Sequence, residues 1–182
     1  AKCLVKDSNY QTLISTKHNK DLIYPRSSIK IFQALPFVLS KAIDKYDLNE
    51  KMIALSCSSH CGESQHLIIL SKWIKKIGLS TKNLKCGSHN PLNHKSSNNL
   101  LLSGQLPNEL HNNCSGKHLG MLSGCLAYNM PFYNYIDYNH PYQKLIRSAL
   151  EYFMETSIKN KHIGIDGCNA PQYAFSLNSL AN

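Results

Sequence analysis

The sequence contains no uninterrupted apolar run near the roughly eighteen residues that a membrane-spanning helix requires. Its first thirty residues carry scattered lysines and aspartates, and no apolar block of the kind that a secretory signal peptide contains. These absences argue against a membrane partner and predict a soluble, cytoplasmic protein. With 182 residues, of which 42% are hydrophobic and 17% charged, the chain is large enough for one globular domain with its own core.

Arginine is scarce, because Arg26 and Arg147 are the only two and the other basic residues are lysines. The net charge of +9 raises the hypothesis of nucleic-acid binding. The lysines are scattered, however, and the densest group, Lys72, Lys75 and Lys76, falls on the polar face of a predicted helix. Nucleic-acid binders usually gather Arg and Lys along one face, often beside aromatic or glycine residues. The charge pattern therefore argues against a nucleic-acid partner.

The sequence also lacks the signs of a disulfide framework. Its cysteines are odd in number, irregularly spaced and without a secretion signal before them, so reduced thiols are expected. We expect some to pack as small apolar side chains and a few to act as ligands. The seven are Cys3, Cys57, Cys61, Cys86, Cys114, Cys125 and Cys168.

Strand signals are few. Two short strands are expected at residues 2–6 and 11–15 around a polar turn, and another at 163–165. Residues 52–56 suggest a further strand or an extended segment, and residues 80–112 have a loop-like composition. One hairpin is too little sheet to be stable alone, so its partners must lie elsewhere.

Helical periodicity is much stronger. Apolar residues at three- and four-residue spacing predict a long helix from Ser27 or Ser28 to Tyr46, bent at Pro36. Further helices are expected at about 64–77, 115–128 and 141–157, and the last eight residues resemble the start of another. The expected fold is therefore a helix-rich α+β domain.

A Ser-x-x-Lys pair, Ser27 and Lys30, stands at the start of the first predicted helix. Residues three apart share one face of a helix. A neutral lysine amine can take the proton of a serine hydroxyl, which is a poor nucleophile without a base. The lysine pKa must then fall from about 10.4 towards neutrality. Burial and a second cation can lower it, and Arg26 is the candidate cation.

The bare pattern also arises by chance in a lysine-rich chain, so its context matters. The helix start, the Pro-Arg dipeptide before Ser27 and the apolar helix after Lys30 all favour the catalytic interpretation.

A second concentration of reactive residues lies at 111–118, with the sequence HNNCSGKH, at the predicted start of a helix. A helix N-terminus lowers the pKa of a thiol, and the resulting thiolate either attacks a substrate or binds a metal. Cys168, in a tight turn beside Asp166 and Gly167, could supply a second sulfur. On spacing alone, a capped helix with a free buried cysteine remains the competing interpretation.

Taken together, five blocks of the chain resemble the L-asparaginase II family, the Rhizobium-etli-type asparaginases. They occur in the family's order and span nearly the whole chain. The blocks are residues 24–30 (YPRSSIK), 33–36 (QALP), 57–63 (CSSHCGE), 111–118 (HNNCSGKH) and 166–171 (DGCNAP). The resemblance implies a fold akin to serine β-lactamases and penicillin-binding proteins, in which a central antiparallel sheet accompanies the helices.

The resemblance also assigns roles to individual residues. Ser27 matches the family's catalytic serine, Lys30 its general base and Ser59 its second active-site serine. Cys114, Lys117 and Cys168 match the residues that hold one zinc ion beside the active site. Lysine binds a metal only as the neutral amine, which again requires a lowered pKa.

Four more residues are expected around the substrate or the metal ligands. His60 and Glu63 share the block of Ser59, and His118 follows Lys117. Arg26 is expected to tune Lys30 or to bind the substrate carboxylate.

The chain departs from the family pattern in ways that suggest an incomplete copy. Family members continue past this C-terminus, where a second active-site lysine and much of the central sheet lie, and a first strand is missing before Ala1. Asn169 and Cys61 are further departures within the matching blocks. We therefore expect residues 1–182 to form a single, incomplete domain with an incomplete sheet.

The resemblance predicts hydrolysis of L-asparagine to L-aspartate and ammonia by a serine–lysine mechanism. One alternative is a penicillin-recognising serine hydrolase, although no S-D-N or K-T-G element is found in the sequence. Another is an inactive, truncated remnant that at most binds zinc. The sequence leaves open the preference between asparagine and glutamine and the oligomeric state, for which a homodimer is one candidate.

Overall fold

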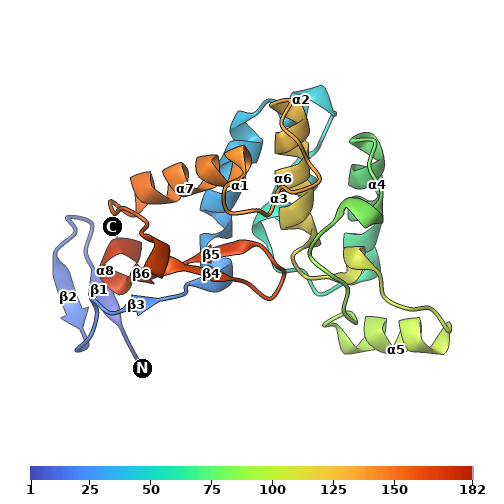
Figure 1. Ribbon diagram of the computed structural model, residues 1–182. Helices are drawn as coiled ribbons and strands as arrows, with labels where there is room; N and C mark the ends of the chain where they lie inside the picture. The colour runs from blue at the N-terminus through green and yellow to red at the C-terminus, as the bar shows by residue number, and fades with distance from the viewer. Residues whose placement is uncertain (182) are drawn as a thin grey trace.

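The computed structural model describes residues 1–181 and shows a helical body with short strands along one side (Figure 1). α1 (Lys30–Leu39), α3 (Glu50–Cys57) and α6 (Ser115–Ala127) pack against one another in its centre. α7 (Pro141–Phe153) packs against α1, and α4 (Ser64–Lys76) packs against α3 and α6. The helices predicted at 64–77, 115–128 and 141–157 are therefore confirmed, with the last one shorter than expected.

The strands of the described residues form three separate antiparallel pairs rather than one continuous sheet. The predicted hairpin and the strand at Ile163–Ile165 are both confirmed. Together with the helices, these pairs give an α+β arrangement. The pairs are β1 (Leu4–Lys6) with β2 (Thr12–Ser15), β3 (Leu22–Ile23) with β6 (Phe175–Ser176), and β4 (Ile163–Ile165) with β5 (Pro171–Tyr173).

Short 3-10 helices connect these elements at four places. They are η1 (Arg26–Ile29), η2 (Thr81–Asn83), η3 (Glu109–His111) and η4 (Asn160–His162). No helix of the described chain has both the length and the apolar content needed to span a membrane.

The single long helix expected up to Tyr46 is divided in two. α1 continues through Pro36 and ends at Leu39, and a separate short helix, α2 (Ala42–Lys45), follows. Between them Lys41 has a left-handed backbone with φ of 62°. The Ser40 hydroxyl donates to Phe37 O at 2.6 Å and accepts from Ala42 N at 3.2 Å. Ser40 thus replaces helical backbone bonds by side-chain bonds, which ends α1.

The prediction of a strand or extended segment at residues 52–56 is wrong, because this segment lies in α3. Asn49 caps the helix by accepting from Met52 N at 3.2 Å, and Met52 and Leu55 are buried on one side. A short apolar run cannot be assigned to strand or helix by periodicity alone.

Further elements were not predicted from the sequence. The loop-like region 80–112 contains α5 (His94–Leu102), in which no residue is buried. Near the C-terminus β5 and β6 precede the expected helix, which is short as α8 (Leu177–Leu180). Without a buried face, α5 leaves no apolar periodicity to detect.

α6 is the most deeply buried helix, and every residue from Ser115 to Cys125 lies in the interior. Glycines allow its neighbours to approach closely. A Cβ at Gly116 would lie 2.3 Å from the Leu55 carbonyl oxygen of α3, and one at Gly124 would lie 2.4 Å from the Tyr142 ring of α7. The position of α3 against the start of α6 therefore depends on the missing side chain of Gly116.

Histidine rings accept backbone N–H groups at several turns. His60 Nδ1 accepts from Gly62 N at 3.2 Å, and His140 Nδ1 accepts from Tyr142 N at 3.1 Å at the start of α7. A doubly protonated imidazole has no free lone pair and cannot accept a hydrogen bond. Burial, followed by repulsion from His66 and Lys30, lowers the pKa of His60 to about 4. The turn at Gly62 therefore requires a neutral His60 ring.

Replacing Gly116 by alanine is expected to lower the free energy of unfolding by about 2 kcal/mol or more, because the new methyl group meets backbone atoms of α3. Gly167→Ala is the control, since its nearest neighbour, Arg26 Nη2, is 3.9 Å from the new Cβ. Urea unfolding measures both variants. Equal stabilities for the two would contradict the close packing of α3 on α6.

The depressed pKa of His60 predicts a loss of stability in acid. The unfolded chain, with a His pKa near 6.5, takes up a proton before the folded chain does. Above pH 6.5 both states carry a neutral His60, and the free energy of unfolding is not reduced by it. As the pH falls from 6.5 towards 4, the free energy of unfolding decreases by up to about 3 kcal/mol.

Urea unfolding of the unmutated protein and of His60→Asn, compared across this pH range, isolates the contribution. The unmutated protein is expected to lose more stability in acid than the variant does. The same pH dependence in both proteins would show that His60 is not held neutral by the fold.

Candidate active site

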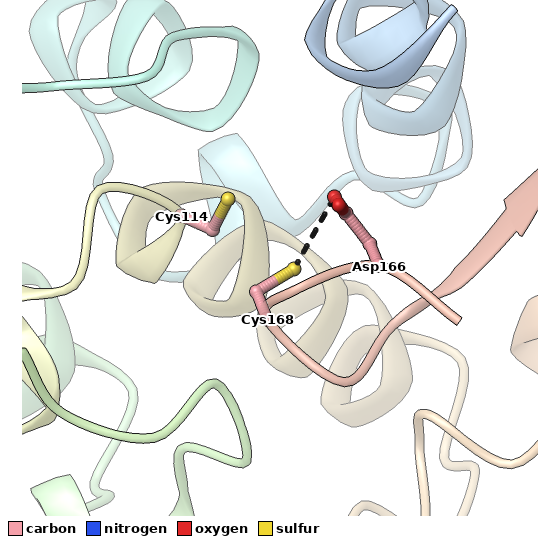
Figure 2. Close-up of side chains that lie close together, drawn as sticks. All are labelled: Cys114, Asp166 and Cys168. Atoms are coloured by element: carbon pink, nitrogen blue, oxygen red, sulfur yellow. Dashed lines mark hydrogen bonds between the residues drawn. The ribbon is translucent and has the colours of Figure 1, made fainter. Parts of the chain in front are cut away.

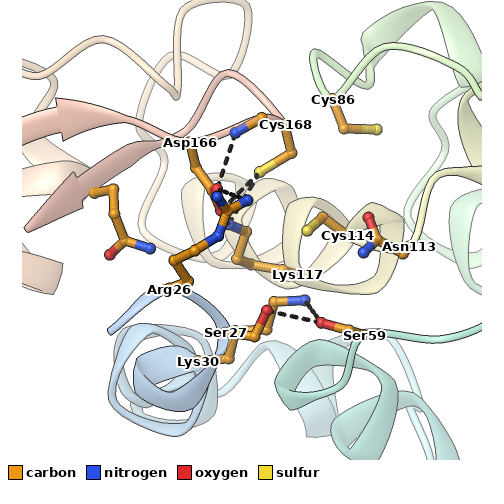
Figure 3. A network of polar contacts seen from close by, with 12 residues as sticks. Arg26, Ser27, Lys30, Ser59, Cys86, Asn113, Cys114, Lys117, Asp166 and Cys168 are labelled. Atoms are coloured by element: carbon orange, nitrogen blue, oxygen red, sulfur yellow. Dashed lines mark hydrogen bonds and ion pairs between the residues drawn. The ribbon is translucent and has the colours of Figure 1, made fainter. Parts of the chain in front are cut away.

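The three side chains predicted to be catalytic meet at the start of α1. Ser27 lies in η1, Lys30 is the first residue of α1, and Ser59 belongs to the loop between α3 and α4. Ser59 Oγ donates to Ser27 Oγ at 3.0 Å and accepts from Lys30 Nζ at 2.8 Å (Figure 3). Lys30 Nζ also donates to Ser58 O at 2.7 Å. Ser59 is thus the hydrogen-bonded link between Ser27 and Lys30.

The two serines and the lysine differ in exposure. Ser27 and Ser59 are exposed, whereas only 1% of Lys30 is accessible. Burial is the largest effect on the pKa of Lys30 and lowers it, and repulsion from Lys117 acts in the same direction. The sulfur of Cys114 opposes this change, but the pKa of Lys30 remains below its ordinary value. The site therefore combines an accessible hydroxyl with a buried amine.

Arg26, expected to be the second cation beside Lys30, is directed elsewhere. Its guanidinium donates to Asp166 Oδ1 at 3.2 Å, and the cation that lowers the pKa of Lys30 is Lys117. Arg26 also has a left-handed backbone with φ of 52°, immediately before Ser27. This conformation is uncommon for a residue other than glycine and is found more often at functional sites.

The predicted cysteine and lysine ligands form one buried cluster (Figure 3). Figure 2 shows its two cysteines beside Asp166. Lys117 Nζ donates to Cys168 Sγ at 3.1 Å. Cys114 Sγ, Cys168 Sγ and a carboxylate oxygen of Asp166 lie within 4.8 Å of one another. Asp166 was not predicted as a ligand, although its place two residues before Cys168 in a tight turn was a signal for it.

The charges in this cluster are strongly coupled. A hydrogen bond with Cys168 is the main cause that lowers the pKa of Cys114, to about 6, and the same bond raises the pKa of Cys168. Burial by itself lowers the pKa of Lys117. The sulfurs of Cys168 and Cys114 together have the larger effect, and the pKa of Lys117 is raised. This direction is opposite to the lowered pKa expected for a metal-binding lysine. A bound dication would instead lower the pKa of Lys117, because the dication competes with the Lys117 proton for the same sulfurs.

The donor set of the cluster is one that fits zinc. Zinc takes sulfur, nitrogen and carboxylate ligands at a tetrahedral centre. Two thiols, one amine and one carboxylate converge here, and Asp166 Oδ2 lies 3.7 Å from both Lys117 Nζ and Cys168 Sγ. Among residues 1–181, no other three His, Cys, Asp or Glu side chains converge in this way.

His118 packs behind the cluster rather than in an open site. Its ring is fully buried, and Nδ1 lies 2.6 Å from the Tyr135 hydroxyl, which accepts from Lys85 N. Nε2 has no hydrogen-bond partner in the structure. Burial lowers the pKa of His118, and the sulfur of Cys168 partly opposes this. His118 is thus placed beside a predicted ligand and away from solvent.

His60 and Glu63, three residues apart in the chain, have different partners in the structure. His60 is 3% exposed, and its Nε2 lies 2.8 Å from Ser115 Oγ at the start of α6. Glu63 is the N-cap of α4, where His66 completes a reciprocal capping box. Glu63 therefore has a role in helix formation, and no contact joins it to Ser27 or Lys30.

A cavity of about 190 Å³ lies beside the salt bridge between Arg26 and Asp166. Its lining residues come from η1, from β4 and β5, and from the segments next to them. They are Tyr24, Arg26, Gly164, Ile165, Asp166 and Gln172. A larger cavity of about 530 Å³ is lined by neither Arg26 nor Asp166. The smaller cavity is therefore the one in contact with the site.

A comparison with known families found a match over the chain. The model of the family described as L-asparaginase II matches residues 1–182, which is the whole chain. No curated protein matches the chain. On the strength of the family match, the chain belongs to the L-asparaginase II family.

Proposed function

We propose that the chain hydrolyses L-asparagine to L-aspartate and ammonia with Ser27 as the nucleophile. The observation that carries the proposal is the unbroken set of hydrogen bonds from exposed Ser27 through Ser59 to buried Lys30. A serine hydroxyl becomes a useful nucleophile when a neighbouring base removes its proton. A buried lysine with a lowered pKa is such a base.

The direction of these hydrogen bonds depends on the proton of Lys30. When the Lys30 amine is charged, it donates to Ser59, and Ser59 donates to Ser27. A neutral amine has one lone pair and two protons, so it can accept from Ser59 while it donates to Ser58 O. The two hydroxyls then rotate, so that Ser27 donates to Ser59 and Ser59 donates to Lys30. Loss of one proton therefore prepares Ser27 for attack.

The reaction follows from this geometry in two steps. Ser27 Oγ forms a bond to the side-chain amide carbon, and its proton passes through Ser59 to Lys30. Lys30 returns a proton to the amide nitrogen, the carbon–nitrogen bond breaks, and ammonia leaves. Water then attacks the aspartyl ester of Ser27 and gives a proton to Lys30. The ester carbon–oxygen bond breaks, Ser27 Oγ takes the proton back from Lys30 through Ser59, and L-aspartate is released.

Arg26 and Asp166 are the proposed contacts for the two charges of the amino-acid substrate. Both line the cavity of about 190 Å³, and Arg26 directly precedes Ser27 in the chain. The Arg26 guanidinium suits the α-carboxylate, and the Asp166 carboxylate suits the α-ammonium group. Their mutual distance of 3.2 Å means that substrate would replace one ion pair by two. This pairing favours an amino acid over a neutral amide.

Cys114, Lys117 and Cys168 are the residues that would hold zinc. A zinc ion bound by them would polarise or position the substrate as a Lewis acid. Cys114 and Lys117 lie at the start of α6 and Cys168 in the turn between β4 and β5, so the proposed metal ligands are different side chains from the proposed serine–lysine network.

The proposed fold relationship is to serine β-lactamases and penicillin-binding proteins, which share the Ser-x-x-Lys pair. A penicillin-recognising hydrolase would use Ser27 and Lys30 in the same way. The buried Cys114, Lys117 and Cys168 cluster favours the asparaginase, because it has no role in penicillin chemistry.

Replacing Ser27 by alanine is expected to lower the rate of ammonia release from L-asparagine about 10⁴-fold or more, because the nucleophile is lost. Ser28→Ala is the matched control, since Ser28 Oγ donates to Pro25 O and is not bonded to Ser59 or Lys30. A coupled assay for ammonia measures both. If the unmutated protein releases no ammonia, the proposal is wrong for this chain and the inactive remnant is favoured.

The purified protein is expected to carry about one zinc ion, and Cys114→Ala is expected to lose it. Cys125→Ala is the control, because Cys125 is buried in the same helix and does not belong to the cluster. Elemental analysis after dialysis measures both variants. Equal zinc contents in the two, or a metal-free protein whose stability zinc leaves unchanged, would rule out the cluster as a zinc site.

A further inference from the structure

The loop that carries Ser59 lies outside every helix and strand of the described chain. It runs from the end of α3 at Cys57 to the start of α4 at Ser64, and Ser59 is exposed on it. Something must nevertheless hold Ser59 Oγ within hydrogen-bond distance of both Ser27 and Lys30. An exposed loop residue without such a restraint would sample many positions.

The next residue, His60, is turned inward and attached to the start of α6. Its Nε2 lies 2.8 Å from Ser115 Oγ, and its backbone N donates to Asn113 O at 3.2 Å. Ser115 is fully buried, and its hydroxyl donates in turn to Leu110 O at 3.1 Å. Asn113 is itself anchored, because its N donates to His89 Nε2 at 3.1 Å. The loop is therefore attached to an ordered part of the core.

The hydrogen bonds assign a single tautomer to His60. Nδ1 accepts from Gly62 N at 3.2 Å, so the ring proton lies on Nε2. Nε2 then donates to Ser115 Oγ, and the Ser115 proton is free to go to Leu110 O. Both ring nitrogens are used and the ring is 3% exposed, which restricts His60 to one orientation.

We propose that His60 is a positioning residue that sets the place of Ser59 Oγ by fixing its loop to Ser115 at the start of α6. The hydrogen bonds of the His60 ring go to Ser115 and Gly62 and not to Ser27 or Lys30, so its positioning effect passes through Ser59. The inference rests on the proposed function, because it gives Ser59 the task of relaying the proton of Ser27. A shift of about 1 Å at a catalytic group can cost on the order of 100-fold in rate.

Two substitutions separate the hydrogen bond of the His60 ring to Gly62 from its hydrogen bond to Ser115. In His60→Asn the side-chain oxygen can still accept from Gly62 N, but the amide is too short to reach Ser115. In His60→Gln the longer amide can donate to Ser115 again. Ser27 is therefore expected to react more slowly in His60→Asn and to recover its rate in His60→Gln.

His140→Asn is the matched control. His140 is also 3% exposed, its Nδ1 also accepts from a backbone N–H two residues on, and its Nε2 bonds an oxygen, Pro131 O. It lies at the start of α7, so His140→Asn removes the same kind of bond away from Ser59. Any loss caused by a weakened fold appears in both asparagine variants.

The experiment measures the rate at which a fluorophosphonate labels Ser27, because this reaction needs the activated hydroxyl but not asparagine. Ser27 Oγ bonds to phosphorus, fluoride leaves, and the proton passes through Ser59 to Lys30. We expect His60→Asn to lower this rate and the kcat for asparagine by about 10- to 100-fold, with KM changed by less than about threefold. His60→Gln is expected to recover most of the rate.

His140→Asn is expected to retain the labelling rate to within about twofold. Equal losses in His60→Asn and His140→Asn, or no rescue by His60→Gln, would overturn the inference. Labelling of Ser27 without any release of ammonia would refute the proposed function, while the labelling rates would still decide the role of His60. No labelling of Ser27 in the unmutated protein would overturn both.

Discussion

The burial of the Lys30 amine is the constraint on which the rest of the site depends. A lysine that is 1% exposed cannot keep a charge without acceptors, and its acceptors are Ser58 O and Ser59 Oγ. The same burial disfavours the charged form and so produces a base within reach of Ser59. The loop after α3 must therefore lie against the start of α1, and the chemistry of Ser27 depends on that packing.

α6 provides the packing that places both halves of the site. Its Gly116 lets α3 approach closely, and its first turn carries Cys114 and Lys117. The loop that holds Ser59 is bonded to the same turn through His60 and Ser115. The serine–lysine network and the cysteine cluster therefore share one support, which explains why Lys117 influences the pKa of Lys30. A disturbance of this turn should reach both.

Sequence reasoning predicted the parts of the fold that bury a periodic face and failed where no such face exists. α4, α6 and α7 follow their apolar spacing, whereas α5 buries nothing and α3 is too short for periodicity to define. In the site, the spacing of Ser27 and Lys30 suggested a pair, but Ser59 was assigned only by resemblance to a family. Lys117 instead of Arg26 beside Lys30 depends on a contact between distant segments, which spacing cannot reveal. Asp166 had a signal in its place two residues before Cys168, but the sequence did not show that it meets Cys114.

The central claim is that Ser27 attacks the substrate with Lys30 as its base. The most direct measurement is mass spectrometry of the protein after it is mixed with L-asparagine and quenched with acid, followed by peptide mapping. The account predicts an aspartyl ester on the peptide that contains Ser27, and its absence in Lys30→Ala. Release of ammonia with the ester on another residue, or with an unchanged yield of ester in Lys30→Ala, would contradict it.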